Sequence, residues 1–158
     1  MYNKKSKVSA VFAIIAALLL VGIMILFPFL MSNTELEGAE VLVIIFAFIL
    51  GFIPLYASAA PFVLVALIFG IKMLKEQSRK KLISFNVRML ITSLVLLPIL
   101  TWSLITSSGL IAESSFGLFP VIYTIATALA YVGGIVAQIV TIAILRKSPE
   151  EVPTATEE

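Results

Sequence analysis

The chain has 158 residues, of which 61% are hydrophobic and 13% charged, and its formal net charge is +2. A soluble domain carries about 25% charged residues, so this composition argues against a soluble globular fold. The sequence contains no Cys, His or Asp, which excludes disulfides and thiol chemistry and removes the commonest ligands of zinc and haem. We therefore expect neither a metal site nor a cofactor.

Four long apolar stretches follow one another along the chain. They cover residues 8–31, 41–71, 87–106 and 118–145. A helix needs about 20 apolar residues to cross the hydrocarbon core of a bilayer, and each stretch reaches that length. The first stretch exceeds the 7–15 residues or so of a secretory signal, so we expect it to be retained. The sequence predicts an all-α integral membrane protein, a four-transmembrane-helix bundle formed by residues 1–147 as one domain.

The basic residues occur only at alternate ends of the apolar stretches. All eleven Lys and Arg precede the first stretch, lie around the connection between the second and third, or follow the fourth. Short connections rich in Lys and Arg stay in the cytoplasm. This pattern predicts a multi-pass protein of the plasma (inner) membrane with both termini inside. Residues 148–158 contain four Glu and two Pro, and we expect them to form a disordered, acidic cytoplasmic tail.

The second stretch is longer than a membrane requires. As a straight helix it would measure about 46 Å, against a hydrocarbon core of about 30 Å. The candidate helix break consists of Gly51, Pro54, Tyr56, Ser58 and Pro61. Each proline removes a backbone hydrogen bond, and the tyrosine and serine between them are candidates to satisfy the freed carbonyl groups. Two interpretations follow: a kinked structural helix, or a broken helix that lines a cavity.

The connection between the second and third stretches is strongly basic. We expect the second helix to continue for a turn or two beyond residue 71, and the third to run from about Asn86 to Thr106. The basic side chains of this connection have two interpretations. They serve only as a topology signal, or they also contact anionic lipid headgroups, in which case each adds about 1 kcal/mol of attraction. The candidate lipid contacts are Lys72, Lys75, Arg79, Lys80, Lys81 and Arg88.

The fourth stretch carries a patterned set of polar residues. Their 4-3-4-3 spacing places them on one face of a helix. A buried amide without a partner is costly, so this face should point into protein or a wet cavity. It either bonds to a neighbouring helix or lines a permeation path or ligand pocket. This candidate intramembrane polar surface comprises Tyr123, Thr127, Tyr131, Gly134, Gln138 and Thr141.

The residue types present argue against several classes of function. Catalysis needs a nucleophile with a base, or a metal with ligands, and we identify no catalytic residue. Proton- or sodium-driven carriers place ionisable groups in the membrane, whereas the spans contain no carboxylate. We therefore expect a non-catalytic membrane protein that acts through helix–helix contacts, as an accessory or regulatory subunit or a small protective (immunity-type) protein. Its partners would be membrane lipids and a membrane protein or further copies of itself, not nucleic acid. The alternative is a passive transporter or channel subunit for a small solute, lined by the second and fourth helices.

Overall fold

The computed structural model describes residues 7–32, 40–112 and 118–147. This part of the chain is helical throughout apart from short connections. Its elements are α2 (Lys7–Ser32), α3 (Glu40–Ala47), the π-helical turn η1 (Phe48–Phe52), α4 (Ile53–Lys75), α5 (Arg79–Ala112) and α6 (Phe119–Lys147). Four helices within these ranges are long and apolar enough to cross a membrane, so the bundle fits the multi-pass membrane protein that the composition predicts. The expected acidic tail, residues 148–158, lies outside the described ranges.

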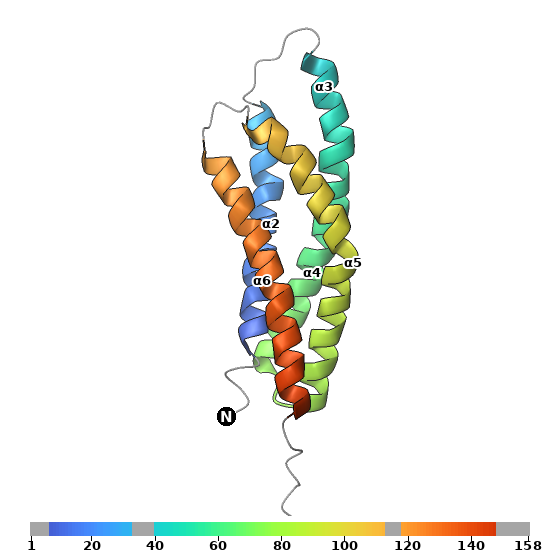
Figure 1. Cartoon of the computed structure of the whole chain (residues 1–158), viewed down its shortest axis with the longest axis vertical. Helices are drawn as coiled ribbons and strands as arrows, with labels where there is room; N and C mark the ends of the chain where they lie inside the picture. The colour runs from blue at the N-terminus through green and yellow to red at the C-terminus, as the bar shows by residue number, and fades with distance from the viewer. Residues whose placement is uncertain (1–6, 33–39, 113–117, 148–158) are drawn as a thin grey trace, which may run out of the picture.

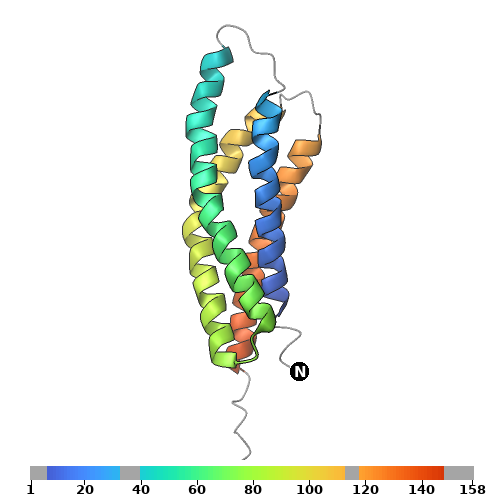
Figure 2. The same ribbon diagram turned by 180° about the vertical axis from the view of Figure 1, so that it is seen from behind.

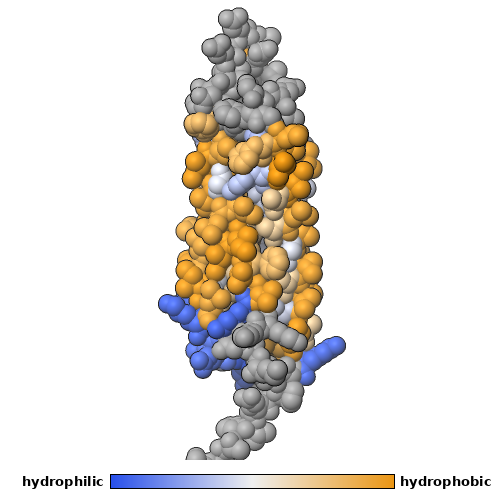
Figure 3. Space-filling view, turned by 90° about the vertical axis from the view of Figure 1, so that its left-hand side faces the viewer, coloured by the Kyte–Doolittle hydropathy of each residue, from blue (hydrophilic) through white to orange (hydrophobic). Residues whose placement is uncertain are grey.

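The helices run up and down and close into a ring. α2 packs against α4 and α6, and α5 packs against the same two helices, so α2 faces α5 across one diagonal and α4 faces α6 across the other. The start of α2, the α4–α5 turn and the end of α6 lie toward one end, which we call the basic end. Figure 3 shows its hydrophilic side chains below a broad apolar surface.

Small residues bring α2 and α4 close together. The buried inner face of α2 is built from Ala10, Ala13, Ala16 and Ala17, and that of α4 includes Ala59, Ala66 and Gly70. Small side chains let the backbones approach, which is how helices associate in lipid without a hydrophobic driving force. Further from the basic end, larger side chains fill the space. There Phe27 packs edge-on against Phe52, with ring centroids 4.9 Å apart.

The second helix is continuous from Glu40 to Lys75 but changes its winding at η1. Pro54 has no N–H to donate to the carbonyl of Leu50, four residues earlier, so the regular ladder cannot continue through this point. The chain accommodates the loss with a wider π-helical turn that ends just before the proline. Such turns interrupt α-helices without unwinding them. The geometry is that of a helix with a local distortion, and α3 extends beyond it, away from α2 (Figure 2).

The tyrosine and serine between the prolines bond elsewhere than expected. The Ser58 hydroxyl donates to the carbonyls of Pro54 (2.7 Å) and Leu55 (3.2 Å). The Tyr56 hydroxyl donates to the Met24 carbonyl of α2. None of these three hydrogen bonds reaches the carbonyls of Leu50 and Ala57, which Pro54 and Pro61 leave without a backbone donor. The expectation that these side chains satisfy them was therefore wrong, and Tyr56 instead ties α4 to its neighbour.

The connection at the basic end is shorter than expected. α4 ends at Lys75, where the Glu76 N–H donates to the Lys72 carbonyl, and α5 begins at Arg79 after three residues. The predicted start of the third helix near Asn86 was thus wrong by two turns. The run from Arg79 to Arg88 is rich in Lys and Arg, which are good helix formers. A hydropathy profile detects long apolar runs, so it does not detect a helical segment that is rich in Lys and Arg.

Glycines at two helix contacts should respond oppositely to a methyl group. A Cβ on Gly70 would lie 2.8 Å from Ile14 Cγ1, whereas one on Gly134 would come no closer than 4.0 Å to Phe12 Cβ. We expect Gly70→Ala to lower the free energy of unfolding in detergent by about 1–3 kcal/mol through overpacking. Gly134→Ala, the matched control, should leave it unchanged or slightly higher because alanine is the better helix former.

Shortening the opposing side chain distinguishes overpacking from a general intolerance of Gly70. In the double variant Gly70→Ala/Ile14→Ala, the glycine substitution should cost less than in the wild-type background. Equal costs in both backgrounds would contradict the steric explanation.

Candidate functional site: the polar core of the bundle

The polar face of α6 turns into the bundle. Thr127, Tyr131, Gly134, Gln138 and Thr141 are all buried, which confirms that the 4-3-4-3 spacing defines one inward face. Tyr123, one turn further from the basic end, is half-buried and packs against the backbone of α2 at Gly22. On the opposite face of α6, apolar residues such as Ile125, Leu129 and Val136 are exposed. In a bilayer the polar groups would therefore be kept away from lipid.

Tyr131 connects α6 to two other helices. Its hydroxyl donates to the backbone carbonyl of Ser93 on α5, with an O–O distance of 2.7 Å. Its ring tilts against Phe62 of α4, with centroids 4.7 Å apart. α4 lies diagonally across from α6, so this aromatic contact crosses the centre of the bundle.

A second cross-bundle contact joins the other diagonal. The Ser9 hydroxyl of α2 donates to Asn86 Oδ1 of α5 at 2.7 Å, and Asn86 Nδ2 donates to the Leu82 carbonyl at 2.9 Å. Both side chains are fully buried. The sequence interpretation missed this pair because it placed Asn86 at a helix terminus, where a polar residue is unremarkable. Because α5 starts at Arg79, Asn86 lies two turns inside the helix. Its amide, like that of Gln138, indicates a helix face that points into the bundle.

Two polar contacts join α5 and α6. The Tyr131 hydroxyl donates to the Ser93 carbonyl, and fourteen residues along each helix, toward the basic end, the Arg79 guanidinium donates to the Leu145 carbonyl. Counting seven residues from either contact along both helices, we expect Gln138 to lie at the level of Asn86. Ser9, Asn86, Ser93, Tyr131 and Gln138 thus form what we call the polar core.

Gln138 is the unsatisfied member of the polar core. Its side chain is buried, and its Oε1 has no hydrogen-bond partner within the described part of the chain. A buried acceptor without a donor costs about 1–3 kcal/mol. Sequence reasoning identified the residue but not this condition, because the partner of an amide depends on which helix faces it.

The basic candidates do not form one site. Arg79 turns toward the end of α6, where its Nε donates to the Leu145 carbonyl (2.6 Å) and its Nη2 to the Arg146 carbonyl (3.1 Å). It thereby satisfies carbonyls that a helix end leaves unpaired. Lys72, Lys75 and Lys81 line an open hollow beside the α4–α5 turn. Lys80 and Arg88 are exposed outside that hollow.

The polar core offers hydroxyl and amide groups but few ionisable ones. No group of three His, Cys, Asp or Glu side chains that could hold a metal occurs in the described ranges. A cavity of about 50 Å³ lies beside the polar core, against Thr127 and Tyr131 of α6 and Leu97, Leu100 and Thr101 of α5. Sites for drug-sized ligands occupy about 300–1,000 Å³, so this cavity suits nothing larger than a few waters.

No protein-family model matches the chain, and neither a curated protein nor a solved structure is significantly similar to it.

The two buried amides should respond oppositely to replacement. Asn86→Leu removes the acceptor of Ser9, and we expect it to lower the free energy of unfolding by about 0.6–1.7 kcal/mol, the range of interhelical hydrogen bonds in membranes. Gln138→Met removes an unpaired oxygen at nearly constant shape, so stability should stay the same or rise. Thermal and denaturant unfolding in one detergent would measure both.

A double-mutant cycle makes the Asn86 result specific. Ser9→Ala and Asn86→Leu should be non-additive, because each removes the same hydrogen bond. Additive losses would contradict a direct coupling. A clear destabilisation by Gln138→Met would mean that the Gln138 amide is satisfied in the folded protein.

Proposed function

We propose that this protein is a non-catalytic, multi-pass protein of the plasma membrane that acts through contacts between its helices and those of a membrane-protein partner. Within that class the protein is an accessory or regulatory subunit or a small protective protein. Both roles require a stable bundle whose outer surface contacts another transmembrane helix.

The inward turn of the polar face of α6 is the observation that carries the proposal. Phe62–Tyr131 and Ser9–Asn86 span the two diagonals of the ring, so polar groups are used to hold the bundle together. A solute path down one copy would need a continuous wet channel along these same residues. The contacts of Tyr131 with Ser93 and Phe62, and the small size of the cavity beside it, argue against such a channel. The shortage of ionisable groups in the polar core argues against chemistry there.

The outer half of the second helix is the best surface for a partner. Outside its own helix, α3 packs chiefly against α5, and that contact is slight compared with the packing among the longer helices. Exposed large apolar side chains lie along α3 and η1: Val41, Leu42, Ile45, Phe46, Ile49 and Leu50. Together they offer an apolar surface of the kind that packs against a second helix. We call it the α3 stripe.

The proposed orientation places the basic end in the cytoplasm. The start of α2, the α4–α5 turn and the end of α6 lie at that end and carry Lys7, Lys72, Lys75, Arg79 and Arg146, as expected for the cytoplasmic side under the positive-inside rule.

Cysteine labelling tests the orientation directly, because the wild-type chain has no cysteine. In intact cells, Asn33→Cys, between α2 and α3, should react with a membrane-impermeant maleimide. Ser78→Cys, in the exposed turn at the basic end, should react only after the cells are opened. The reverse pattern would overturn the orientation.

A partner that binds the α3 stripe should be lost when its large side chains are truncated. Extraction of the tagged protein from its native membrane into lipid-retaining particles, followed by native mass spectrometry, should reveal a distinct protein at fixed stoichiometry. Leu42→Ala/Phe46→Ala should reduce its yield by about fivefold or more, the effect of removing interface residues worth 1 kcal/mol or more.

The matched control truncates equally exposed residues on another helix. Ile125→Ala/Leu129→Ala on α6 should leave the yield of the partner unchanged. Loss in both variants would indicate a nonspecific effect on the bundle. A closed homo-oligomer with no second protein would contradict the proposal and favour a pore formed between copies, which liposome flux would then test.

A further inference from the structure

A hollow of about 490 Å³ opens at the basic end between the last turn of α4 and the first turns of α5. Ile71, Lys72 and Lys75 line it from α4, Lys81 and Phe85 from α5, and Glu76 from the turn between them. Three lysines and one glutamate leave it positively charged. The hollow therefore combines a basic rim with apolar walls.

Charge and hydrophobicity change along the hollow in the same direction on both helices. Lys75 lies four residues beyond Ile71 on α4, and Lys81 lies four residues before Phe85 on α5. Residues four apart share a helix face, so each helix puts a lysine toward the basic end and an apolar residue one turn further in. Phe85 is held by Phe69 of α4, with ring centroids 5.5 Å apart.

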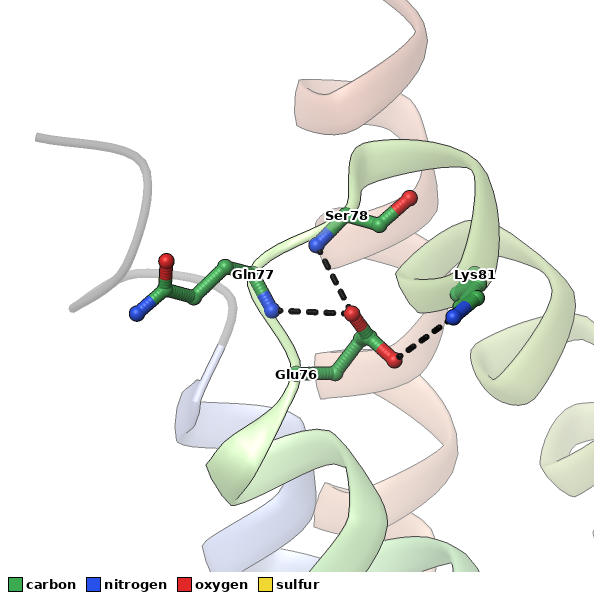
Figure 4. A network of polar contacts seen from close by, with 4 residues as sticks. All are labelled: Glu76, Gln77, Ser78 and Lys81. Atoms are coloured by element: carbon green, nitrogen blue, oxygen red, sulfur yellow. Dashed lines mark hydrogen bonds and ion pairs between the residues drawn. The ribbon is translucent and has the colours of Figure 1, made fainter.

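The one acidic residue of the hollow is directed at the turn and not at a ligand. Glu76 Oε1 accepts hydrogen bonds from the backbone N–H groups of Ser78 (3.0 Å) and Gln77 (3.1 Å), and Oε2 lies 3.7 Å from Lys81 Nζ (Figure 4). The hydrogen bond from Ser78 is the main cause that lowers the pKa of Glu76. The carboxylate thus stays ionised and shapes the turn, while Lys81 remains 66% exposed and able to meet an anion.

We propose that this hollow binds the phosphate headgroup of an anionic phospholipid, with the lysines around the phosphate and the first part of an acyl chain against Ile71 and Phe85. The basic-to-apolar order along both helices matches the order of headgroup and chain in a leaflet. A free phosphate would use the lysines alone and leave the apolar walls without a role. This inference goes beyond contacts with a protein partner and needs only insertion into a membrane.

Lipid retention measured by native mass spectrometry tests the proposal. The protein would be reconstituted in vesicles of equimolar phosphatidylglycerol and phosphatidylcholine, released, and its bound lipids counted. We expect wild type to retain phosphatidylglycerol in preference to phosphatidylcholine. Lys72→Gln/Lys75→Gln/Lys81→Gln should reduce that preference by about tenfold or more, because each basic group near an anionic surface contributes several-fold.

The control removes the same charge from outside the hollow. Lys80→Gln/Arg88→Gln/Lys147→Gln should keep the preference, and circular dichroism should show that both triple variants remain helical. Equal losses in the two variants would overturn the site and indicate diffuse attraction to the surface. Symmetric vesicles present the lipid at both faces, so a negative result here would not bear on the proposed orientation or on a protein partner.

A second arm separates lipid from free phosphate. In phosphatidylcholine vesicles alone, inorganic phosphate at matched ionic strength should leave the melting temperature unchanged, whereas added phosphatidylglycerol should raise it. An equal rise with inorganic phosphate, lost in the hollow variant, would contradict the lipid assignment.

Discussion

In an apolar medium a polar side chain is costly unless it finds a hydrogen-bond partner inside the protein, and in this bundle that cost explains how most of the polar side chains are directed. α6 turns its hydroxyl and amide groups inward, and Tyr131 meets a carbonyl of α5. α2 and α5 meet through Ser9 and Asn86. Once these faces are fixed, the remaining surfaces of the helices must be apolar and face outward. The broad apolar surface of Figure 3 is thus the counterpart of the polar core.

The same requirement acts on the backbone at the second helix. Pro54 withholds one hydrogen bond, and the chain responds with the turn η1 while remaining helical. The distortion separates two parts with different surroundings. α4 is packed by small residues against α2, whereas α3 makes only slight contact with α5. The part of the helix that packs least is therefore the part that has most to gain from a partner.

Much of the fold could be predicted from the sequence, because run length and the spacing of polar residues are local properties. The four long helices and the inward face of α6 follow from them. The start of α5 could not be found in this way, since the first turns of the helix mix Lys and Arg with apolar residues and so break the apolar run, and Asn86 was overlooked as a consequence. The pairing of Ser9 with Asn86 depends on which helices face each other across the ring. Two features arise only when the α4–α5 turn is formed: the hydrogen bonds from Arg79 to α6, and the hollow lined by Lys72, Lys75 and Lys81.

The two polar contacts between α5 and α6 have a mechanical consequence. Arg79 donates a hydrogen bond to α6 at one end of this pair, and Tyr131 donates one to α5 near its middle. Sliding one helix along the other by a turn, about 5.4 Å, would break both hydrogen bonds together. The two helices should therefore keep their register, and bending of the bundle should occur at η1 and at Pro98 inside α5.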